Sequence, residues 1–329
     1  MDNGKIVTVT LNPSLDKTLI THHLNIGYHN RVAETTHLDA SGRGVNVSRA
    51  LNRLGVATHA IVLLGDDAFG RAYRGLLREE AFPSTFVIQT GPMRSDTIIV
   101  NRSDGTETHI IDEGAGGSQE GIQQVIEKLV TVLEPGDRVV FAGDLPRDVS
   151  SESYLRMSEA ALEAGGQVIL MAGGDAFSQA LRARPALTVL TRLEAEALFN
   201  YPVRTDADMI SGGQKLRELG AAEALIVMED YSRAVLVTGE DTWLVEIAET
   251  GPGTDSGVAD GLLAGYLAGL SQGMPVSEAL RLGAAEMNYA DSQIGNEFGS
   301  LDQIRQLFHR VNVRLLEKDD KPPLASAGA

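Results

Sequence analysis

Residues 44–65, GVNVSRALNRLGVATHAIVLLG, join a helix pattern to a strand pattern. The apolar side chains of the first part recur at helical spacing: Val47, Ala50, Leu51 and Leu54. Gly55 follows them, which is typical of a helix C-terminus. The second part, HAIVLLG (59–65), is a short apolar run with β-branched residues, which indicates a strand buried on both faces. A helix followed by such a strand is the unit of a parallel α/β sheet.

The same kind of apolar run recurs along the chain. The runs are KIVTVTL (5–11), HAIVLLG (59–65), DRVVFAG (137–143), QVILMAG (167–173), LTVLT (187–191) and EALIVM (223–228). Further helices are expected at about 118–133, 151–164, 205–219, 257–271, 276–291 and 300–316. Helix-length segments between buried strands predict an α/β fold with a doubly wound, mostly parallel sheet and helices on both faces.

Two regions break the alternation, at about 17–39 and 85–112. The second reads as strand, turn, strand, turn, strand without a helix, so we expect it to be antiparallel. Together the two regions predict a small β-sheet that lies over the core as a lid. The chain otherwise reads as one domain over 1–316, and the polar, proline-containing tail 317–329 is expected to be disordered.

The charge balance argues against nucleic acid as a partner. The 329-residue chain has 28 Lys and Arg against 45 Asp and Glu, a formal net charge of -17, which repels polyphosphate backbones over most of the surface. An anionic ligand must therefore be met by a few placed arginines and by backbone N–H groups. Individual arginines are informative for this reason.

The composition also excludes several classes of protein. Without cysteine the chain has neither disulfides nor thiolate metal sites. Its start lacks the charged and long apolar regions of a signal peptide, and no apolar run approaches the ~18 residues of a membrane span. We therefore expect a cytoplasmic protein with no membrane partner.

Ligands of open parallel sheets bind beyond the carboxyl ends of the strands. NPSLDK (12–17) follows the first strand, and its Asp16 is either a ligand for sugar hydroxyls or an ordinary turn residue. In ASGRGVNV (40–47), Gly42 lets the backbone approach a ligand, Arg43 can form a forked pair with phosphate, and Asn46 can reach a ligand from the first helical turn. The alternative is a glycine-rich helix cap with a solvated arginine.

Asp260 lies in the first turn of the helix expected at 257–271. A carboxylate there is ordinary, because the exposed N–H groups and the positive helix end favour it. Alternatively, the N–H groups of Gly257, Val258 and Ala259 cradle a transferred phosphoryl group while Asp260 takes a proton from the attacking hydroxyl. Arg94, in a turn of the expected lid, is either solvated or a ligand under a closed lid.

Four segments, in this order, resemble the ribokinase-like PfkB carbohydrate kinases, in particular the branch of 1-phosphofructokinases and tagatose-6-phosphate kinases. The segments are VTVTLNPSLDKT (7–18), GRGVNVSRALNRLG (42–55), LLGDDAFG (63–70) and GVADGLLAGYLAGL (257–270). The resemblance covers nearly the whole chain. It implies a ribokinase-like core with a small β-lid, through which members often dimerise, and transfer of the γ-phosphoryl group of ATP, with Mg²⁺, to a sugar hydroxyl.

The resemblance also implies roles for single residues. Asp260 would be the general base beside the anion hole of Gly257, Val258 and Ala259. The remaining implied residues are Asp16, Gly42 and Asn46 on the sugar hydroxyls, and Arg43 (more often Lys in the family) and Arg94 on the phosphate that the acceptor already carries. The acceptor would be fructose 1-phosphate, fructose 6-phosphate or tagatose 6-phosphate.

The nucleotide side departs from the family pattern. The Gly-Ala-Gly-Asp signature reads Gly257, Val258, Ala259, Asp260, and the alanine costs strain only if its φ is positive. Asp255 adds a charge that opposes ATP. The family's metal-associated Asn-x-x-Glu motif has Leu193 in place of Asn and retains Glu196 as the expected Mg²⁺ and nucleotide ligand.

The segment expected to border the nucleotide, MEDYSR (228–233) with Asp230, lacks the family's glycines. The residues expected to bind the sugar are thus retained, whereas several of those expected to bind the nucleotide are altered. Two hypotheses follow from this contrast. In the first the protein is a sugar-phosphate kinase. In the second it is a weakened or inactive homologue that binds a sugar phosphate as a sensor or regulatory subunit.

Overall fold

The structure is a computed structural model that describes residues 4–34, 37–114, 116–249, 251, 253–254 and 256–316. Asp255, expected to oppose ATP, and the tail 317–329, expected to be disordered, lie outside these residues. In the part of the chain that is described, no helix is both long and apolar enough to cross a bilayer.

The main sheet has the strand order β14-β13-β12-β11-β10-β9-β8-β1-β4-β5. Its strands are β1 (Ile6–Thr10), β4 (Thr58–Gly65), β5 (Ser84–Gln89), β8 (Arg138–Ala142), β9 (Gln167–Met171), β10 (Leu187–Thr191), β11 (Glu223–Val227), β12 (Arg233–Val237), β13 (Thr242–Ile247) and β14 (Val311–Leu315). The strands from β5 to β11 pair in parallel, and β12, β13 and β14 continue the sheet antiparallel. The order reverses at β1, which has β4 on one side and β8 on the other.

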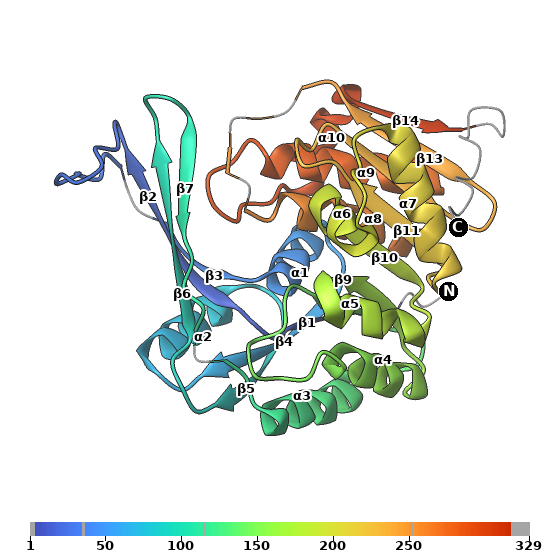
Figure 1. Ribbon diagram of the computed structural model, residues 1–329, viewed down its shortest axis with the longest axis horizontal. Coiled ribbons are helices and arrows are strands. Elements are labelled where there is room, and N and C mark those ends of the chain that lie inside the picture. The colour runs from blue at the N-terminus through green and yellow to red at the C-terminus, as the bar shows by residue number, and fades with distance from the viewer. Residues whose placement is uncertain are drawn as a thin grey trace.

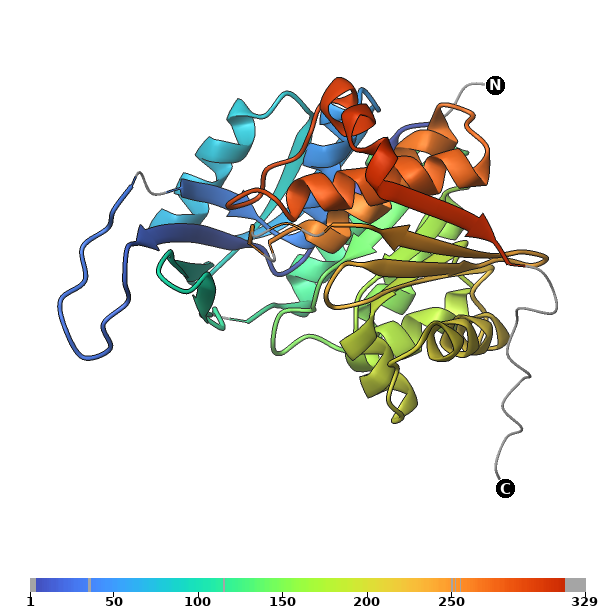
Figure 2. The same ribbon diagram turned by 90° about the horizontal axis from the view of Figure 1, so that it is seen from above.

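Helices cover both faces of this sheet (Figures 1 and 2). On one face lie α1 (Arg43–Arg53), α2 (Ala68–Glu79), α8 (Val258–Ser271), α9 (Val276–Ala290) and the short α10 (Leu301–Gln306). On the other lie α3 (Gln119–Val132), α4 (Ser153–Glu163), α5 (Gly174–Ala180), α6 (Arg192–Phe199) and α7 (Asp206–Glu218). Alternate residues of β1 feed the two cores, since Ile6 packs with α8 and α9 while Val7 and Val9 pack with α3 and α4. The predicted fold class is confirmed.

A second sheet of four strands projects from the main one (left in Figure 1). Its order is β3 (His37–Ser41), β2 (Ser14–Thr21), β6 (Arg94–Asn101) and β7 (Thr106–Ile110). The expectation that 85–112 is antiparallel and belongs wholly to the lid holds only for β6 and β7. β5 instead pairs in parallel with β4 at the edge of the main sheet, because Val87 packs into the core under α3. β2 and β6 are also parallel.

The C-terminal helix expected at 300–316 is much shorter than predicted. Its start is confirmed, with a capping box between Ser300 and Gln303, but α10 ends at Gln306. After a 3₁₀ turn at Phe308–Arg310, residues 311–315 form β14 and pair with β13. Pairing with a sheet edge thus overrides the local helix pattern, as tertiary context commonly does.

Candidate active site

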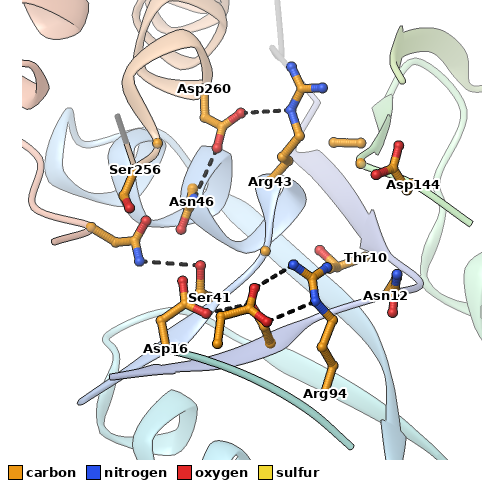
Figure 3. Close-up of a pocket in the computed structure, with 17 residues that line it drawn as sticks. Thr10, Asn12, Asp16, Ser41, Arg43, Asn46, Arg94, Asp144, Ser256 and Asp260 are labelled. Carbon is orange, nitrogen blue, oxygen red and sulfur yellow. Dashed lines mark hydrogen bonds and ion pairs between the residues drawn. The ribbon is translucent and has the colours of Figure 1, made fainter. Parts of the chain in front are cut away.

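A cavity of about 250 Å³ lies at the switch point of the main sheet, where the chain leaves β1 and β8 (Figure 3). Thr10 and Asn12 come from the end of β1, and Gly143 and Asp144 follow β8. The four-stranded sheet closes the opposite side with residues of β2, β3 and β6. This is the position at which doubly wound sheets bind their ligands.

Asp260 lies in the first turn of α8 and its carboxylate lines the cavity (Figure 3). Its side chain is nearly inaccessible, with the residue 3% exposed. Arg43 Nε donates to its Oδ1 at 3.2 Å, and Asn46 Nδ2 donates to its Oδ2 at 3.0 Å. Burial raises the pKa of Asp260, while the Arg43 charge and these hydrogen bonds oppose the rise. The carboxylate is thus held in one orientation at the cavity wall.

Gly257, at the start of α8, lines the same cavity, whereas Val258 and Ala259 are not among its lining residues. Gly257, the N-cap, has a φ of 75°, and a Cβ there would meet Phe298 Cζ at 2.9 Å. Gly261 donates its N–H to Gly257 O, so the N–H groups of the three residues between them, Val258 to Asp260, have no acceptor within the helix. Ala259 lies inside α8 and does not have a positive φ. Its replacement of the family glycine therefore costs little strain.

Arg43 is the first residue of α1 and is bound by two carboxylates. Besides Asp260, its NH1 donates to Glu194 Oε1 of α6 at 2.8 Å. Gly42, the N-cap of α1, has a φ of 140°, and a Cβ at this position would lie 2.6 Å from Thr10 Cγ2. Glycine is therefore required where the chain turns into the helix beside the cavity.

The small sheet brings three ionisable side chains to the cavity face. In the parallel register of β2 and β6, Asp16 lies beside Asp96, and Arg94 donates through Nε to Asp96 Oδ1 at 3.2 Å. Ser14 Oγ donates to Asp16 Oδ1 at 2.5 Å. Burial raises the pKa of Asp16 to about 6, helped by the neighbouring Asp96 charge and opposed by Ser14 and Arg94. Both arginines predicted to bind phosphate thus line the cavity and also have carboxylate partners.

The predicted nucleotide ligands Glu196 and Asp230 are not among the described residues that line this cavity. Glu196 Oε1 accepts hydrogen bonds from Arg192 NH1 and Val203 N, both at 2.8 Å. The Val203 N–H and the Arg192 partner lower the pKa of Glu196. Asp230 Oδ1 accepts from Ser232 N and Oγ in a local turn.

A resident Mg²⁺ does not fit these residues. Mg²⁺ binds through carboxylates and waters in octahedral geometry. Leu193, 51% exposed at the expected ligand position, has no donor atom, and Glu196 is already held by Arg192 and Val203. Within the described ranges, no three acidic or histidine side chains are grouped so that they could hold a metal ion.

Several residues of the site were not predicted from the sequence. Asp96 could have been found, because a strand places residues i and i+2 on one face and Arg94 was already a candidate. Asn296 Nδ2 donates to Ser41 Oγ at 3.2 Å, and its buried Oδ1 lacks a protein partner in the described part of the chain. Asn296 and Asp144 had no local sequence signal, and the spacing of Thr191 and Glu194 signals only a helix start, since tertiary folding alone brings these residues to the site.

Comparison with known proteins identifies similar sequences and structures among carbohydrate kinases. Residues 9–295 match the model of the pfkB family carbohydrate kinases. The chain is 30% identical to the 1-phosphofructokinase of Bacillus subtilis over 311 residues, which cover 94% of this chain and 100% of that protein. It is 25% identical to the tagatose-6-phosphate kinase of Staphylococcus epidermidis, covering 94% and 99%. The crystal structure of phosphofructokinase-2 from Escherichia coli superposes with a TM-score of 0.85 at 25% identity, covering 93% of this chain and 98% of that one.

Proposed function

Because the chain belongs to the pfkB family of carbohydrate kinases, which are phosphotransferases, we propose that it transfers the γ-phosphoryl group of ATP to a hydroxyl of a phosphorylated ketohexose. The acceptors proposed are fructose 1-phosphate, fructose 6-phosphate and tagatose 6-phosphate. Their support is the names of the relatives, which are 1-phosphofructokinases and tagatose-6-phosphate kinases.

One observation carries this proposal. A buried carboxylate, Asp260, and the helix N-cap, Gly257, line the cavity that Asp16 lines from the other side. Asp260 would take the proton of the attacking hydroxyl, and the N–H groups of Gly257, Val258 and Ala259 would stabilise the charge on the transferred group. Phosphoryl transfer depends mainly on such positioning and charge stabilisation.

The acceptor would be held by the other predicted residues. Asp16 would accept hydrogen bonds from sugar hydroxyls, with Gly42 and Asn46 beside it. Asn46 is already oriented, because its Oδ1 accepts from Arg49 NH1 at 3.2 Å. Arg43 and Arg94 would meet the phosphate that the acceptor carries, in exchange for part of their contact with carboxylates.

The donor proposed is ATP with its Mg²⁺, as in the family. The α8 amides suit the terminal phosphate, because the N–H groups of Val258 to Asp260 have no acceptor within the helix. The metal supplies charge neutralisation of the phosphates when it is bound. The residues of α6 do not form a metal site of their own.

A coupled ADP-release assay tests the proposal. ATP, Mg²⁺ and each of the three sugar phosphates are supplied in turn, with the Asp260→Asn variant as the reference for background. At least one acceptor should raise ADP release well above that reference. If none does, the kinase proposal fails.

Replacing Arg94 with Ala should weaken binding of the phosphorylated acceptor about ten- to a hundred-fold, the usual range for a charge-assisted contact. The unphosphorylated ketose should lose much less. Isothermal titration calorimetry with both ligands measures the difference. Arg102→Ala is the matched control, because Arg102 follows the same strand but pairs with the exposed Glu34. Equal losses for both ligands would mean that Arg94 does not bind phosphate.

Replacing Gly257 with Ala should lower kcat about ten-fold and destabilise the fold by about 1–2 kcal/mol, since an L-residue is strained at positive φ. The new Cβ would also press on Phe298 and lie 3.3 Å from Asn46 Nδ2. Gly273→Ala is the control at the other end of α8, with a φ of 74° and nothing within 4 Å of its Cβ. It should show the strain in a thermal melt and retain activity. Equal kinetic losses in both variants would contradict a role for Gly257 in the cradle.

The alternative, a homologue that binds a sugar phosphate as a sensor or regulatory subunit, is favoured by one observation. Arg192 and Val203 hold the family's metal-associated Glu196, and Leu193 stands in the Asn position. In that case the titration above would detect the sugar phosphate, and ADP release would stay at the reference rate for every acceptor.

We also propose that two copies pair through the four-stranded sheet. β7 is exposed along nearly its whole length, and Leu38, Ile110 and Ile111 are 47%, 58% and 62% exposed. Leu38 and Ile110 share one sheet face, because the register aligns both with Lys17 and Thr97, and apolar side chains exposed on one face favour burial against a partner.

A further inference from the structure

The contacts of Arg43 join three elements that are far apart in the sequence. Arg43 starts α1, Asp260 lies in the first turn of α8, and Glu194 lies in the first turn of α6. Its guanidinium uses Nε for Asp260 Oδ1 and NH1 for Glu194 Oε1. The Arg43 and Glu194 side chains are 25% and 22% exposed, and that of Asp260 is 4% exposed. One cation is thus shared by a buried carboxylate and a partly exposed one.

Glu194 is itself held in place by its helix. Its Oε2 accepts the N–H of Thr191 at 2.8 Å, and its own N–H is bonded to Thr191 Oγ1 at 3.3 Å, which forms a capping box. Both oxygens of Glu194 therefore have assigned donors, one in the helix cap and one on Arg43. Glu194 thus holds the guanidinium at NH1, while Asp260 holds it at Nε.

We propose that Glu194 is a positioning residue that acts through Arg43 on the orientation and basicity of Asp260. The inference rests on the proposed function, since it concerns the group assigned as base. Without the Glu194 charge, the full charge of Arg43 would act on Asp260 and make it a weaker base. Without the Glu194 side chain, the guanidinium would lose the contact that sets its direction.

Other charged and polar groups also face Asp260. On α1 they are Arg43 and Asn46, and on α6 Glu194. The same cavity is lined after β8 by Asp144 and on the small sheet by Asp16, Arg94 and Asp96. Glu194 differs from the last four in sharing a guanidinium with Asp260 directly.

The pKa directions agree with this geometry. Burial raises the pKa of Asp260, Arg43 lowers it, and Glu194 raises it further. For Arg43, burial lowers the pKa but the charges of Glu194 and Asp260 raise it more, so the guanidinium stays protonated.

The test is the Glu194→Gln variant, whose amide oxygen can still accept from Arg43 while the charge is gone. Carbon-13 NMR of aspartate-labelled protein follows the titration of Asp260, and the Asp260→Asn variant identifies its resonance. The titration midpoint should fall by about 0.5–1 pH unit, the size expected for loss of one nearby like charge. The acidic limb of the kcat profile should shift by the same amount. The NMR result is obtained even if the protein turns over no acceptor.

Asp208→Asn is the matched control. Asp208 occupies the same capping-box position in α7, where it accepts from Thr205 N at 2.9 Å, and it does not line the cavity. Both variants should melt earlier because each weakens a helix cap. Only Glu194→Gln should move the Asp260 midpoint. An unchanged midpoint in Glu194→Gln, or an equal shift in Asp208→Asn, would overturn the proposal.

Glu194→Ala separates orientation from charge. It should lower kcat about ten-fold further than Glu194→Gln while the KM for ATP stays within about two-fold, because the variant removes the anchor of Arg43 and no proposed nucleotide contact. If Glu194→Ala and Glu194→Gln have the same kcat, Glu194 does not position Arg43.

Discussion

Replacement of Asp260 by Asn is expected to reduce kcat by about a thousand-fold or more, the upper part of the range for loss of a general base. Asparagine has nearly the same shape, and its carbonyl oxygen can still accept from Arg43, which donates to Asp260 Oδ1 in the wild type. It cannot take a proton from the acceptor hydroxyl. Affinity for the sugar phosphate should change less than about ten-fold, because the proposed phosphate contacts remain. Coupled ADP release and calorimetry measure the two effects.

The control for this variant is Asp302→Asn. Asp302 also lies in the first turn of a helix, α10, and does not line the cavity. If Asp260 only complements the helix dipole, each substitution should cost about 0.3–1 kcal/mol of stability, and the two variants should have similar kcat values. Retention of more than a tenth of the wild-type kcat in Asp260→Asn would contradict its role as base. A large loss in Asp260→Asn alone would support it.

The main sheet could be predicted from sequence because its strands are buried on both faces and separated by helices. Six apolar runs coincide with β1, β4, β8, β9, β10 and β11. β5 was misplaced because its run STFVIQ resembles the lid strands that follow, and only the pairing with β4 decides which sheet it joins. The last strand, β14, was predicted as helix for a similar reason, since its partner β13 lies more than 60 residues earlier in the chain.

The cavity was predictable only where chemistry and local pattern coincide. Gly257, Asp260, Gly42, Arg43 and Asn46 lie at the starts of two helices, and these local signals placed them in one cavity. The partners that define their state come from elsewhere. No pattern in RLEAEALF (192–199) shows that Glu194, rather than Glu196, faces Arg43, because a helix turns these two residues to different sides. Only the orientation of α6 in the fold decides which of the two glutamates contacts Arg43.

Behind the base, the fold buries a second carboxyl group. Glu286 of α9 is 0% exposed and packs against α8, where a Cβ on Gly261 would lie 3.4 Å from Glu286 Cγ. Its Oε1 accepts the N–H of Gly299 at 2.8 Å, and its Oε2 has no protein partner in the described part of the chain. Burial raises the pKa of Glu286 from 4.5 to about 8, against the effect of the Gly299 N–H and the Arg53 charge.

This carboxyl should make the fold less stable as pH rises. The unfolded chain releases the proton above pH 4.5, whereas the folded chain retains it up to about pH 8. The folded state therefore binds more protons in this window, and the free energy of unfolding falls with pH until the folded carboxyl also ionises. Each pH unit costs at most about 1.4 kcal/mol.

Glu286→Gln removes this dependence and keeps an oxygen for the Gly299 N–H. From pH 5 to pH 8, the free energy of unfolding of the variant should therefore rise relative to wild type by about 2–4 kcal/mol. Urea denaturation at several pH values measures it, because groups common to both proteins cancel in the difference. Glu159→Gln, at an exposed position of α4, is the control, and its free energy of unfolding should change with pH as that of the wild type does. A Glu286→Gln curve that also runs parallel to wild type would show that Glu286 is ionised in the folded protein.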